Sequence, residues 1–448
     1  MSAPPLRRAL CLAYGAGSIG AGIFSTIPGL LLLFYLTDTL AVPAGLAGLA
    51  LLIPKLWDVI TDPIVGAWSD RTRTRWGRRR PFLLAGALLL PPCFMALFMA
   101  PVGDPIVSFC WVLIAFCAAA GAFTLFQVPY ATMPTEMTGD YHERTTLVAY
   151  RMAFVTVGIL AGGALAPELI EAGGGGVEGY ASMAVVLALV AMGAMLVAFF
   201  GTRSAAQSEA VASAVGLRAQ LGVALAYQPF RRLLGAYALQ CVALGAVLAA
   251  VPYFVRYTLQ AGNSGLTLLF VCLVAPAIVT MPGWTALSRR FGKRRAYIVA
   301  AVIFAVMSMS LIFAGPGPLW RVGAQVGVLG VGFAGLQVFP FAILPELIDA
   351  DSRATGLRRE GVFTALWFVG EKAGFATGAW LVSGILAMTG FLERRAGELV
   401  AQPEAALLGV HLATALAPAL LVALSLPLLF QHHESDRKTH RATGAQLA

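Results

Sequence analysis

The stretch KLWDVITDPIVGAWSDRTRTRWGRRRPF, residues 55–82, places two carboxylates in an apolar segment directly before six arginines. Asp58 and Asp62 are four residues apart, so on a helix they lie one turn apart on the same face, with Lys55 three residues before Asp58. Charges in a membrane-spanning helix cost at least about 2.5–3.5 kcal/mol each on insertion scales, so a cluster of them indicates an ion or substrate pathway. The flanking segments LAGLALLIP and IVGAW are apolar on all sides, which disfavours a soluble helix with a solvated charged face.

Composition predicts an all-α integral membrane protein. Of 448 residues, 59% are hydrophobic and 12% are charged, about half the usual charged share of a soluble domain. The net charge of +9 is concentrated in short loops between apolar runs, in residues 71–80 and again in residues 289–295. This is the positive-inside pattern, so we expect no nucleic-acid partner and place both termini and both basic loops in the cytoplasm. The opposite loops are poor in basic residues, with Arg321, Arg394 and Arg395 the main exceptions.

Apolar runs of about 20 residues or more, the length that crosses a bilayer, predict twelve spans in two sets of six. The first set is 10–36, 43–69, 81–100, 105–135, 145–167 and 181–202. The second set is 229–258, 264–288, 296–315, 318–348, 360–389 and 404–430. We therefore predict an N-terminal six-helix bundle (1–202), a cytoplasmic linker (203–228), a C-terminal six-helix bundle (229–431) and a cytoplasmic tail (432–448).

The two halves resemble one another in sequence. Gln127, Val128 and Glu136 recur 210 residues on, and the neighbouring prolines recur one step out of register. The recurring residues are Gln337, Val338 and Glu346, beside Pro129, Pro134, Pro340 and Pro345. Duplicated sets of six spans are the architecture of the major facilitator superfamily, whose substrate site lies near the midplane. We expect the prolines to break their helices at such a site, where freed backbone groups line a cavity.

Asp58 and Asp62 are the predicted cation site. Two carboxylates on adjacent turns, with a hydroxyl such as that of Thr124 nearby, offer a hard cation several oxygen ligands, or share one proton. They are metal ligands if the ion is sodium, and the residues do not separate sodium from proton. The alternative is that both carboxylates only neutralise Lys55 and the arginines.

Asp70 is predicted to act in gating. It lies at the end of its helix and can accept hydrogen bonds from arginines in its own loop and near the fourth span, of which Arg71 and Arg144 are the candidates. Such a latch would have to break for the inward-facing state to form.

Three charged residues lie inside predicted spans: Arg151 in span five, and Glu371 and Lys372 in span eleven. A charge inside a membrane-spanning helix costs free energy, so each of them is expected to face a partner or a polar substrate. A structural ion pair with Asp58, Asp62 or Glu371 is the alternative. The cysteines form no CxxC pair, and no catalytic triad, metal cluster or phosphate-binding loop is present in the sequence. We therefore expect neither an enzyme nor a cofactor. A channel is disfavoured because the charges are placed asymmetrically.

The sequence resembles the glycoside-pentoside-hexuronide:cation symporters, the melibiose permease-like branch of the major facilitator superfamily. The matching segments are YGAGSIG (14–20), WDVITDPIVGAWSDRTRTRWGRRRPF (57–82), VPYATMPTEMTGDYHERTTLVAYR (128–151) and FVGEKAG (368–374). By position, the resemblance implies a coupling-cation site at Asp58, Asp62 and Thr124. It also implies substrate contact and coupling at Arg151 and Lys372.

The chain departs from that pattern at its sugar residues. Gln127 and Gly22 stand where the melibiose permeases have aspartates, and Ala131 and Gln337 replace tryptophans. Fewer acids beside two retained cations make the pocket more positive, which favours an anionic substrate such as a hexuronide. The VPY and AYRM pieces are similar to the related lysophospholipid symporters, so an anionic amphiphile is the alternative.

The sequence thus predicts a multi-pass, monomeric symporter of the plasma membrane, the inner membrane if the protein is bacterial. It would couple Na+ or H+ to a small-molecule or amphiphilic substrate by alternating access. The predicted substrate and coupling residues are Arg151, Lys372, Gln127, Gln337 and Glu371.

Overall fold

The computed structural model describes residues 8–138, 140–203, 225–355, 360–398 and 400–429. This part of the chain is helical, apart from loops and one isolated β-bridge between Leu40 and Arg395. Most of the predicted linker (204–224) and the whole predicted tail lie outside the described residues.

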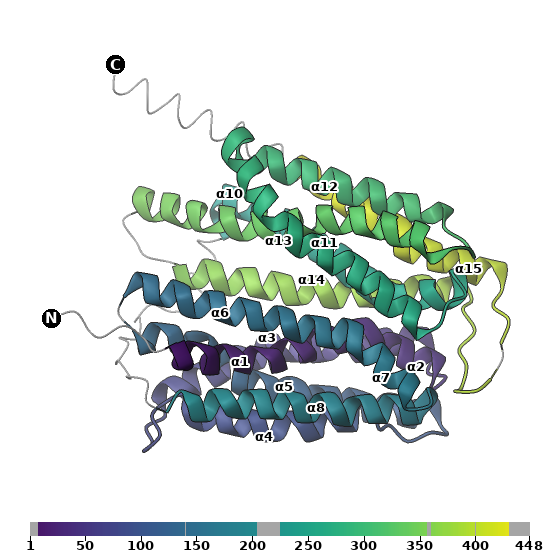
Figure 1. Ribbon diagram of the computed structural model, residues 1–448, viewed down its shortest axis with the longest axis horizontal. Coiled ribbons are helices and arrows are strands. Elements are labelled where there is room, and N and C mark those ends of the chain that lie inside the picture. Colours follow the sequence, from purple (N-terminus) through teal and green to yellow (C-terminus); the bar gives the residue numbers. More distant parts are fainter. Residues whose placement is uncertain (1–7, 139, 204–224, 356–359, 399, 430–448) are drawn as a thin grey trace. The chain divides into compact units, whose positions relative to one another are not determined.

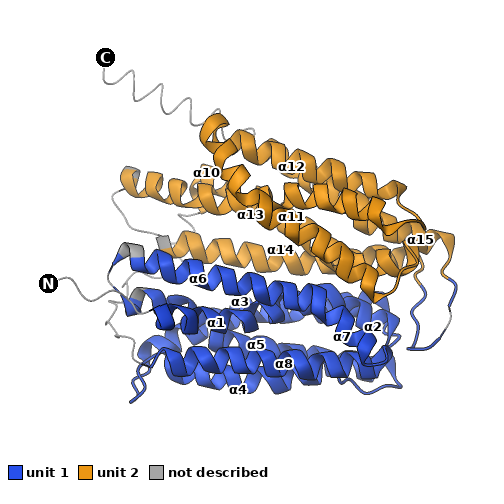
Figure 2. Cartoon of the chain, viewed as in Figure 1, with its two compact units in different colours: residues 1–212, 392–401 blue, residues 213–391, 402–448 orange. Residues whose placement is uncertain are grey.

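Two compact units divide the chain, and within each unit the helices run alongside one another (Figures 1 and 2). Unit 1 comprises residues 1–212 and 392–401, and unit 2 comprises residues 213–391 and 402–448. The helices of unit 1 are α1 (Arg8–Ile27), α2 (Leu33–Asp38), α3 (Ala44–Arg71), α4 (Arg80–Leu97), α5 (Pro105–Met137), α6 (Tyr141–Leu160), α7 (Ala166–Ala172) and α8 (Gly176–Gly201). Those of unit 2 are α10 (Gln228–Tyr253), α11 (Asn263–Phe291), α12 (Lys293–Ser310), α13 (Leu319–Thr355), α14 (Glu360–Met388) and α15 (Glu404–His411).

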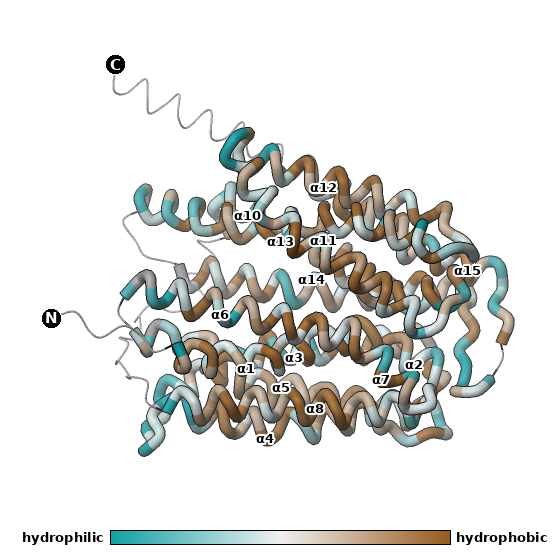
Figure 3. The backbone as a smooth tube through the Cα atoms, in the orientation of Figure 1, coloured by the Kyte–Doolittle hydropathy of each residue, from teal (hydrophilic) through white to brown (hydrophobic). Residues whose placement is uncertain are grey.

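Single π-helical turns join several of these helices into longer spans. They are Pro28–Leu32, Ala161–Leu165, Phe254–Thr258 and Leu412–Leu416. Eleven of the described helical stretches are long and apolar enough to cross a membrane. The predicted eleventh span is α14, which has 29 residues but carries the adjacent charges Glu371 and Lys372. Apolar residues dominate the helix middles and polar residues gather toward the ends (Figure 3), so the predicted all-α membrane fold is confirmed.

Helix α1 is the centre of unit 1, and its glycines allow close packing. A β-carbon at Gly22 would clash with the carbonyl oxygen of Val155 on α6, and one at Gly158 would clash with that of Ile19 on α1. Unit 2 repeats this crossing between α10 and α14, where β-carbons at Gly245 and Gly378 would meet backbone atoms of the other helix. The matched crossings agree with the internal duplication that the sequence indicates.

The prolines of α5 do not break it, contrary to the prediction. Helix α5 runs without interruption through Pro129 and Pro134, and α13 likewise runs through its two prolines. A proline leaves the carbonyl four residues before it without its usual donor. For Pro134 that carbonyl belongs to Tyr130, and it accepts a hydrogen bond from the hydroxyl of Tyr14 at 3.1 Å. A neighbouring helix thus satisfies the freed group and the helix continues.

Residues 392–401 are a second difference from the prediction, which placed 229–431 in one bundle. This segment groups with unit 1 rather than with the helices on either side of it in the chain. Its backbone binds the end of α2, where Arg394 N donates to Thr37 O at 3.0 Å and Ala396 N donates to Thr39 O at 3.1 Å. Sequence patterns carry no signal for such contacts, because they join residues more than 350 positions apart.

Candidate functional site

Asp62 and Thr124 are brought together across two helices of unit 1. The Thr124 hydroxyl on α5 donates to Asp62 Oδ1 on α3 at 2.9 Å. Asp58 lies one turn earlier on α3 and is 1% exposed, and its Oδ2 is 3.8 Å from Lys55 Nζ. Three of the predicted residues therefore share one region of unit 1, as the spacing and the resemblance predict.

Lys55 is held between two aromatic rings as well as beside Asp58. Its Nζ lies 6.0 Å from the ring centre of Phe24 on α1 and 5.7 Å from that of Phe116 on α5. A cation over an aromatic face is attracted by the ring quadrupole. The two rings therefore hold Lys55 near Asp58, at the end of the cluster that lies farther from Asp62 along α3. With both acids ionised, the cluster of Asp58, Asp62 and Lys55 carries one net negative charge. One bound monovalent cation or one proton would neutralise it.

Arg151 on α6 is positioned by a buried tyrosine. Its guanidinium carbon lies 5.6 Å from the ring centre of Tyr130, which stacks on Tyr14 with ring centres 4.6 Å apart. The Tyr130 hydroxyl is fixed by Ser18 Oγ at 2.8 Å. Sequence reasoning missed this support, because Tyr14, Ser18 and Tyr130 resemble ordinary core residues of apolar helices.

Gln127 lies one helical turn before Tyr130 on α5. Its Oε1 and the Nε of Arg151 are buried atoms with no hydrogen-bond partner among the described residues. Buried polar atoms are usually paired, so an unpaired acceptor and an unpaired donor on adjacent helices suit a polar ligand.

The other predicted substrate residues lie in unit 2. Glu371 and Lys372 are on α14, and Gln337 is on α13. Glu371 Oε2 accepts a hydrogen bond from the Tyr237 hydroxyl at 2.9 Å, and the Tyr237 ring stacks on Trp367 at 4.2 Å with an interplanar angle of 9°. Tyr237 is a second supporting residue that the sequence did not reveal.

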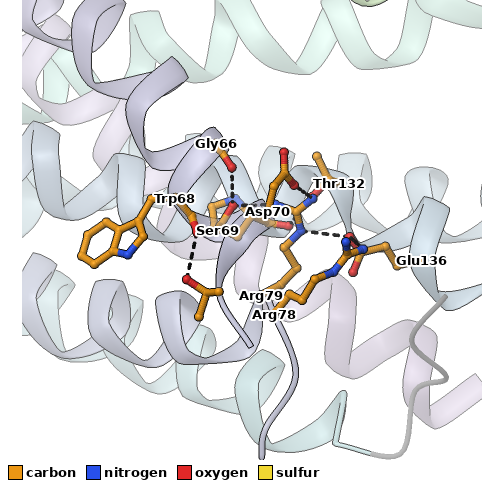
Figure 4. A network of polar contacts seen from close by, with 10 residues as sticks. Gly66, Trp68, Ser69, Asp70, Arg78, Arg79, Thr132 and Glu136 are labelled. Atoms are coloured by element: carbon orange, nitrogen blue, oxygen red, sulfur yellow. Dashed lines mark hydrogen bonds and ion pairs between the residues drawn. The ribbon is translucent and has the colours of Figure 1, made fainter. Parts of the chain in front are cut away.

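Asp70 forms an ion pair with Arg79, an arginine of its own loop as the prediction has it, rather than with the two named candidates Arg71 and Arg144. One terminal nitrogen of the Arg79 guanidinium lies 2.5 Å from Asp70 Oδ1 (Figure 4). The Nε of Arg79 lies 2.9 Å from Glu136 Oε1, and the other terminal nitrogen donates to Ser69 Oγ at 2.5 Å. Arg78 adds a contact of 3.0 Å to Glu136. The network joins the end of α3, the start of α4 and the end of α5.

The two arginines named in the prediction have other positions. Arg71 is exposed at the end of α3, and Arg144 Nε donates to the carbonyl of Thr138 at 2.8 Å. The sequence did carry a signal for the true partners. Arg79 belongs to the arginine block, and Glu136 is one of the residues repeated in the second half.

Unit 2 contains the counterpart of this network. Lys293, at the start of α12, forms an ion pair with Glu346 Oε1 and donates to the carbonyl of Ala342 at 3.2 Å. Glu136 and Glu346 thus occupy equivalent places in the two halves, each binding a basic residue at the start of the preceding helix, α4 or α12. The equivalence strengthens the case for duplication beyond the sequence pattern.

Replacing Arg79 by alanine should lower the stability of the folded protein by about 2–3 kcal/mol. Breaking a buried pair costs about 3–5 kcal/mol, and Arg78 still compensates Glu136. The measurement is the thermal denaturation midpoint in detergent. Arg73→Ala, which removes an exposed arginine of the same loop, is the control. Equal midpoints for the two variants would show that the network adds nothing to stability.

Helical spans in two units, with a polar cluster inside one of them, define a membrane transporter of the major facilitator type. The family model described as MFS/sugar transport protein matches residues 13–432, so the chain belongs to that family. The predicted relation to the glycoside and hexuronide cation symporters is confirmed.

Three relatives match this chain over nearly its whole length. An uncharacterized symporter of Synechocystis sp. is 28% identical, covering 99% of this chain and 98% of its own. A glucuronide carrier protein homolog of Escherichia coli is 24% identical (95% and 93%), and a sodium-dependent lysophosphatidylcholine symporter of Danio rerio is 26% identical (98% and 87%). Among solved structures, a bacterial homolog of the human lysosomal transporter Spinster has a TM-score of 0.70 at 14% identity, with 96% of each chain covered. The relatives and the fold are those of transporters.

Proposed function

We propose that this protein is a cation-coupled secondary symporter that carries an anionic glycoside, of the hexuronide class, by alternating access. Asp58, Asp62 and Thr124 hold the coupling cation. The observation that carries the proposal is the cluster on α3 and α5, where a buried carboxylate lies beside Lys55 and a second carboxylate, one turn further along α3, is bonded to the hydroxyl of Thr124.

The assignment of the transported substrate to an anionic class rests on Arg151 and Gln127. Arg151 is held against Tyr130 with Nε unpaired among the described residues, and a guanidinium is suited to bidentate binding of a carboxylate. Gly22 supports the same assignment, because its crossing with Gly158 leaves no room for the sugar-binding acid of the melibiose permeases. Close packing of α1 against α6 therefore explains why position 22 carries no acidic side chain. By the resemblance, Lys372 is a further proposed contact of the anionic group.

An anionic amphiphile is the second candidate. The full-length similarity to a sodium-dependent lysophosphatidylcholine symporter favours it, and a phosphate group suits Arg151 as well as a carboxylate does. The two cargos share the anionic group and differ in the size of their apolar part.

The test is a thermal-stability screen of the purified protein against uronides, neutral glycosides and lysophospholipids, with and without sodium and at two pH values. A ligand that binds only the folded state raises stability by mass action. We expect stabilisation by uronides that increases with the coupling cation, and none by the uncharged glycosides. Stabilisation by lysophospholipids alone supports the amphiphile, and equal stabilisation by neutral glycosides contradicts both assignments. Accumulation of the best ligand against its gradient in proteoliposomes then separates a symporter from a passive pore.

Thr124→Val should weaken binding of the coupling cation without abolishing transport. Valine keeps the shape and removes a hydroxyl bonded to a carboxylate, an interaction worth about 1.5–3 kcal/mol, so the apparent cation affinity should fall by about tenfold or more. The measurement is the cation concentration that gives half-maximal uptake. Thr285→Val is the matched control, because among the described residues that hydroxyl binds the carbonyl of Met281 within its own helix and no carboxylate. An unchanged half-maximal concentration removes Thr124 from the site.

A further inference from the structure

Arg80 is a nearly buried arginine for which the described residues provide no acidic partner. It is the first residue of α4 and is 8% exposed. Its two neighbours in the arginine block, Arg78 and Arg79, both contact Glu136. Arg80 instead donates one terminal nitrogen to the carbonyl of Phe199 at 3.0 Å, and its Nε is a buried donor with no partner among the described residues. Burying a charge costs free energy unless the charge is paired, so an anion would stabilise this guanidinium.

The contacts of Arg80 with α8 explain its position but do not compensate its charge. Helix α4 packs against α8 in unit 1 (Figure 1). The carbonyl of Phe199 is one of the last in α8, and the last carbonyls of a helix lack partners within it. The guanidinium carbon of Arg80 also lies 4.6 Å from the ring centre of Phe199. A carbonyl and a ring face attract a cation but carry no net charge, so the positive charge of Arg80 remains available to an anion.

Two further features make this part of unit 1 attractive to an anion. Arg203 follows the end of α8, where its backbone N–H donates to the carbonyl of Phe200 at 3.2 Å, and it is exposed. Arg203 lies close enough to Arg80 for the two positive charges to repel each other. The start of α4 has no side-chain cap, and the N-terminus of a helix favours negative charge. An anion bound here would meet two guanidinium groups and a helix N-terminus.

The same place is the boundary of two helices that can cross a membrane. Helix α4 begins at Arg80 and α8 ends at Gly201, and both are long and apolar enough to span a bilayer. Trp76, in the loop before α4, is 39% exposed, and its ring packs edge-on against Phe199 with ring centres 5.9 Å apart. Phe200 is exposed as well. Exposed tryptophan is typical of the depth of the lipid headgroups, and basic pockets between helices at this depth bind anionic headgroups.

We propose that Trp76, Arg80, Phe200 and Arg203 form a binding site for an anionic phospholipid, in the leaflet on the side of the loop 72–79. The two arginines bind the phosphate group, and the two aromatic side chains contact the glycerol backbone and the first part of the acyl chains. All four residues belong to unit 1. None of them belongs to the proposed cation or substrate residues, so the lipid site does not rest on the proposed function.

A lipid titration of the purified protein in detergent tests the site. The probes are phosphatidylglycerol and phosphatidylcholine with the same acyl chains, and native mass spectrometry counts the bound lipid. We expect one saturable site for phosphatidylglycerol and weaker binding of phosphatidylcholine, whose choline cation the arginines repel. A basic residue beside an anionic headgroup contributes about fivefold in affinity, so Arg203→Gln should weaken phosphatidylglycerol about fivefold and the double variant with Arg80→Gln still more. Arg73→Gln, at an exposed arginine of the same loop, should bind as the parent does.

Equal binding of the two lipids, or equal weakening by Arg73→Gln and Arg203→Gln, overturns the proposal, because either result means unspecific attraction to basic loops. Arg203 is exposed, so its variant should fold even if the variant at Arg80 does not. Inorganic phosphate is the second probe, and it should not raise the denaturation midpoint at concentrations where phosphatidylglycerol does. Equal stabilisation by phosphate overturns the assignment to a lipid. Loss of the bound lipid in Arg151→Gln but not in Arg203→Gln places the lipid at the proposed substrate residues and likewise overturns this site.

Discussion

Asp58→Asn should abolish accumulation driven by the coupling cation while the protein stays folded. Asp58 is buried beside Lys55, and Asp62 is the second acid of the cluster. Without the Asp58 charge, Lys55 and Asp62 compensate each other and the cluster no longer carries the net negative charge that attracts a cation. Removing one partner of a buried ion pair also costs stability, so the uptake of the variant is compared at a temperature below its denaturation midpoint. The measurement is uptake into proteoliposomes under an imposed sodium or proton gradient.

Asp349→Asn is the matched control for this variant. Asp349 is an exposed aspartate on α13, and replacing it should leave gradient-driven uptake at the level of the parent protein. The denaturation midpoint of Asp58→Asn without ligand shows whether the variant is folded. Undiminished accumulation by folded Asp58→Asn would refute the assignment of the cation site to this cluster.

Gly22→Ala should destabilise the protein, although alanine is normally the better helix former by about 1 kcal/mol. The new methyl group would meet the backbone of α6 at Val155, Gly158 and Ile159. Overpacking of a tight core costs about 1–3 kcal/mol, and backbone atoms yield less readily than side-chain ends do. We expect a lower denaturation midpoint and a smaller yield of monodisperse protein.

Gly193→Ala on α8 is the matched control, for which no loss of stability is expected. A β-carbon at Gly193 meets no atom within 4 Å, so this variant should be as stable as the parent or slightly more stable. The comparison uses the same substitution in two helices of unit 1. A Gly22→Ala midpoint as high as that of Gly193→Ala would mean that α1 and α6 do not cross as closely as the structure shows. It would also reopen position 22 as a possible substrate contact.

The predicted spans agree with the observed helices to within a few residues at most ends, because the length of an apolar run is a local property of the chain. The clearest example is α3, predicted as 43–69 and observed as Ala44–Arg71. Asp58 and Asp62 were placed on one face by their spacing alone, since the helical period fixes that relation. The prediction that the prolines break their helices was wrong. Whether a freed carbonyl breaks a helix depends on a donor from elsewhere, here Tyr14.

The sequence by itself determined that this is a membrane protein of two related halves, and it located the proposed cation-binding pair on one helix. Hydropathy, charge placement and helical period act over a few turns, so they can be read without the fold. The tertiary structure alone decided which partners those side chains have: Thr124 for Asp62, Tyr130 for Arg151, Arg79 for Asp70, and Arg394 for Asp38. Most of these contacts join residues far apart in the chain. Their geometry depends on how the helices cross, which local patterns do not specify.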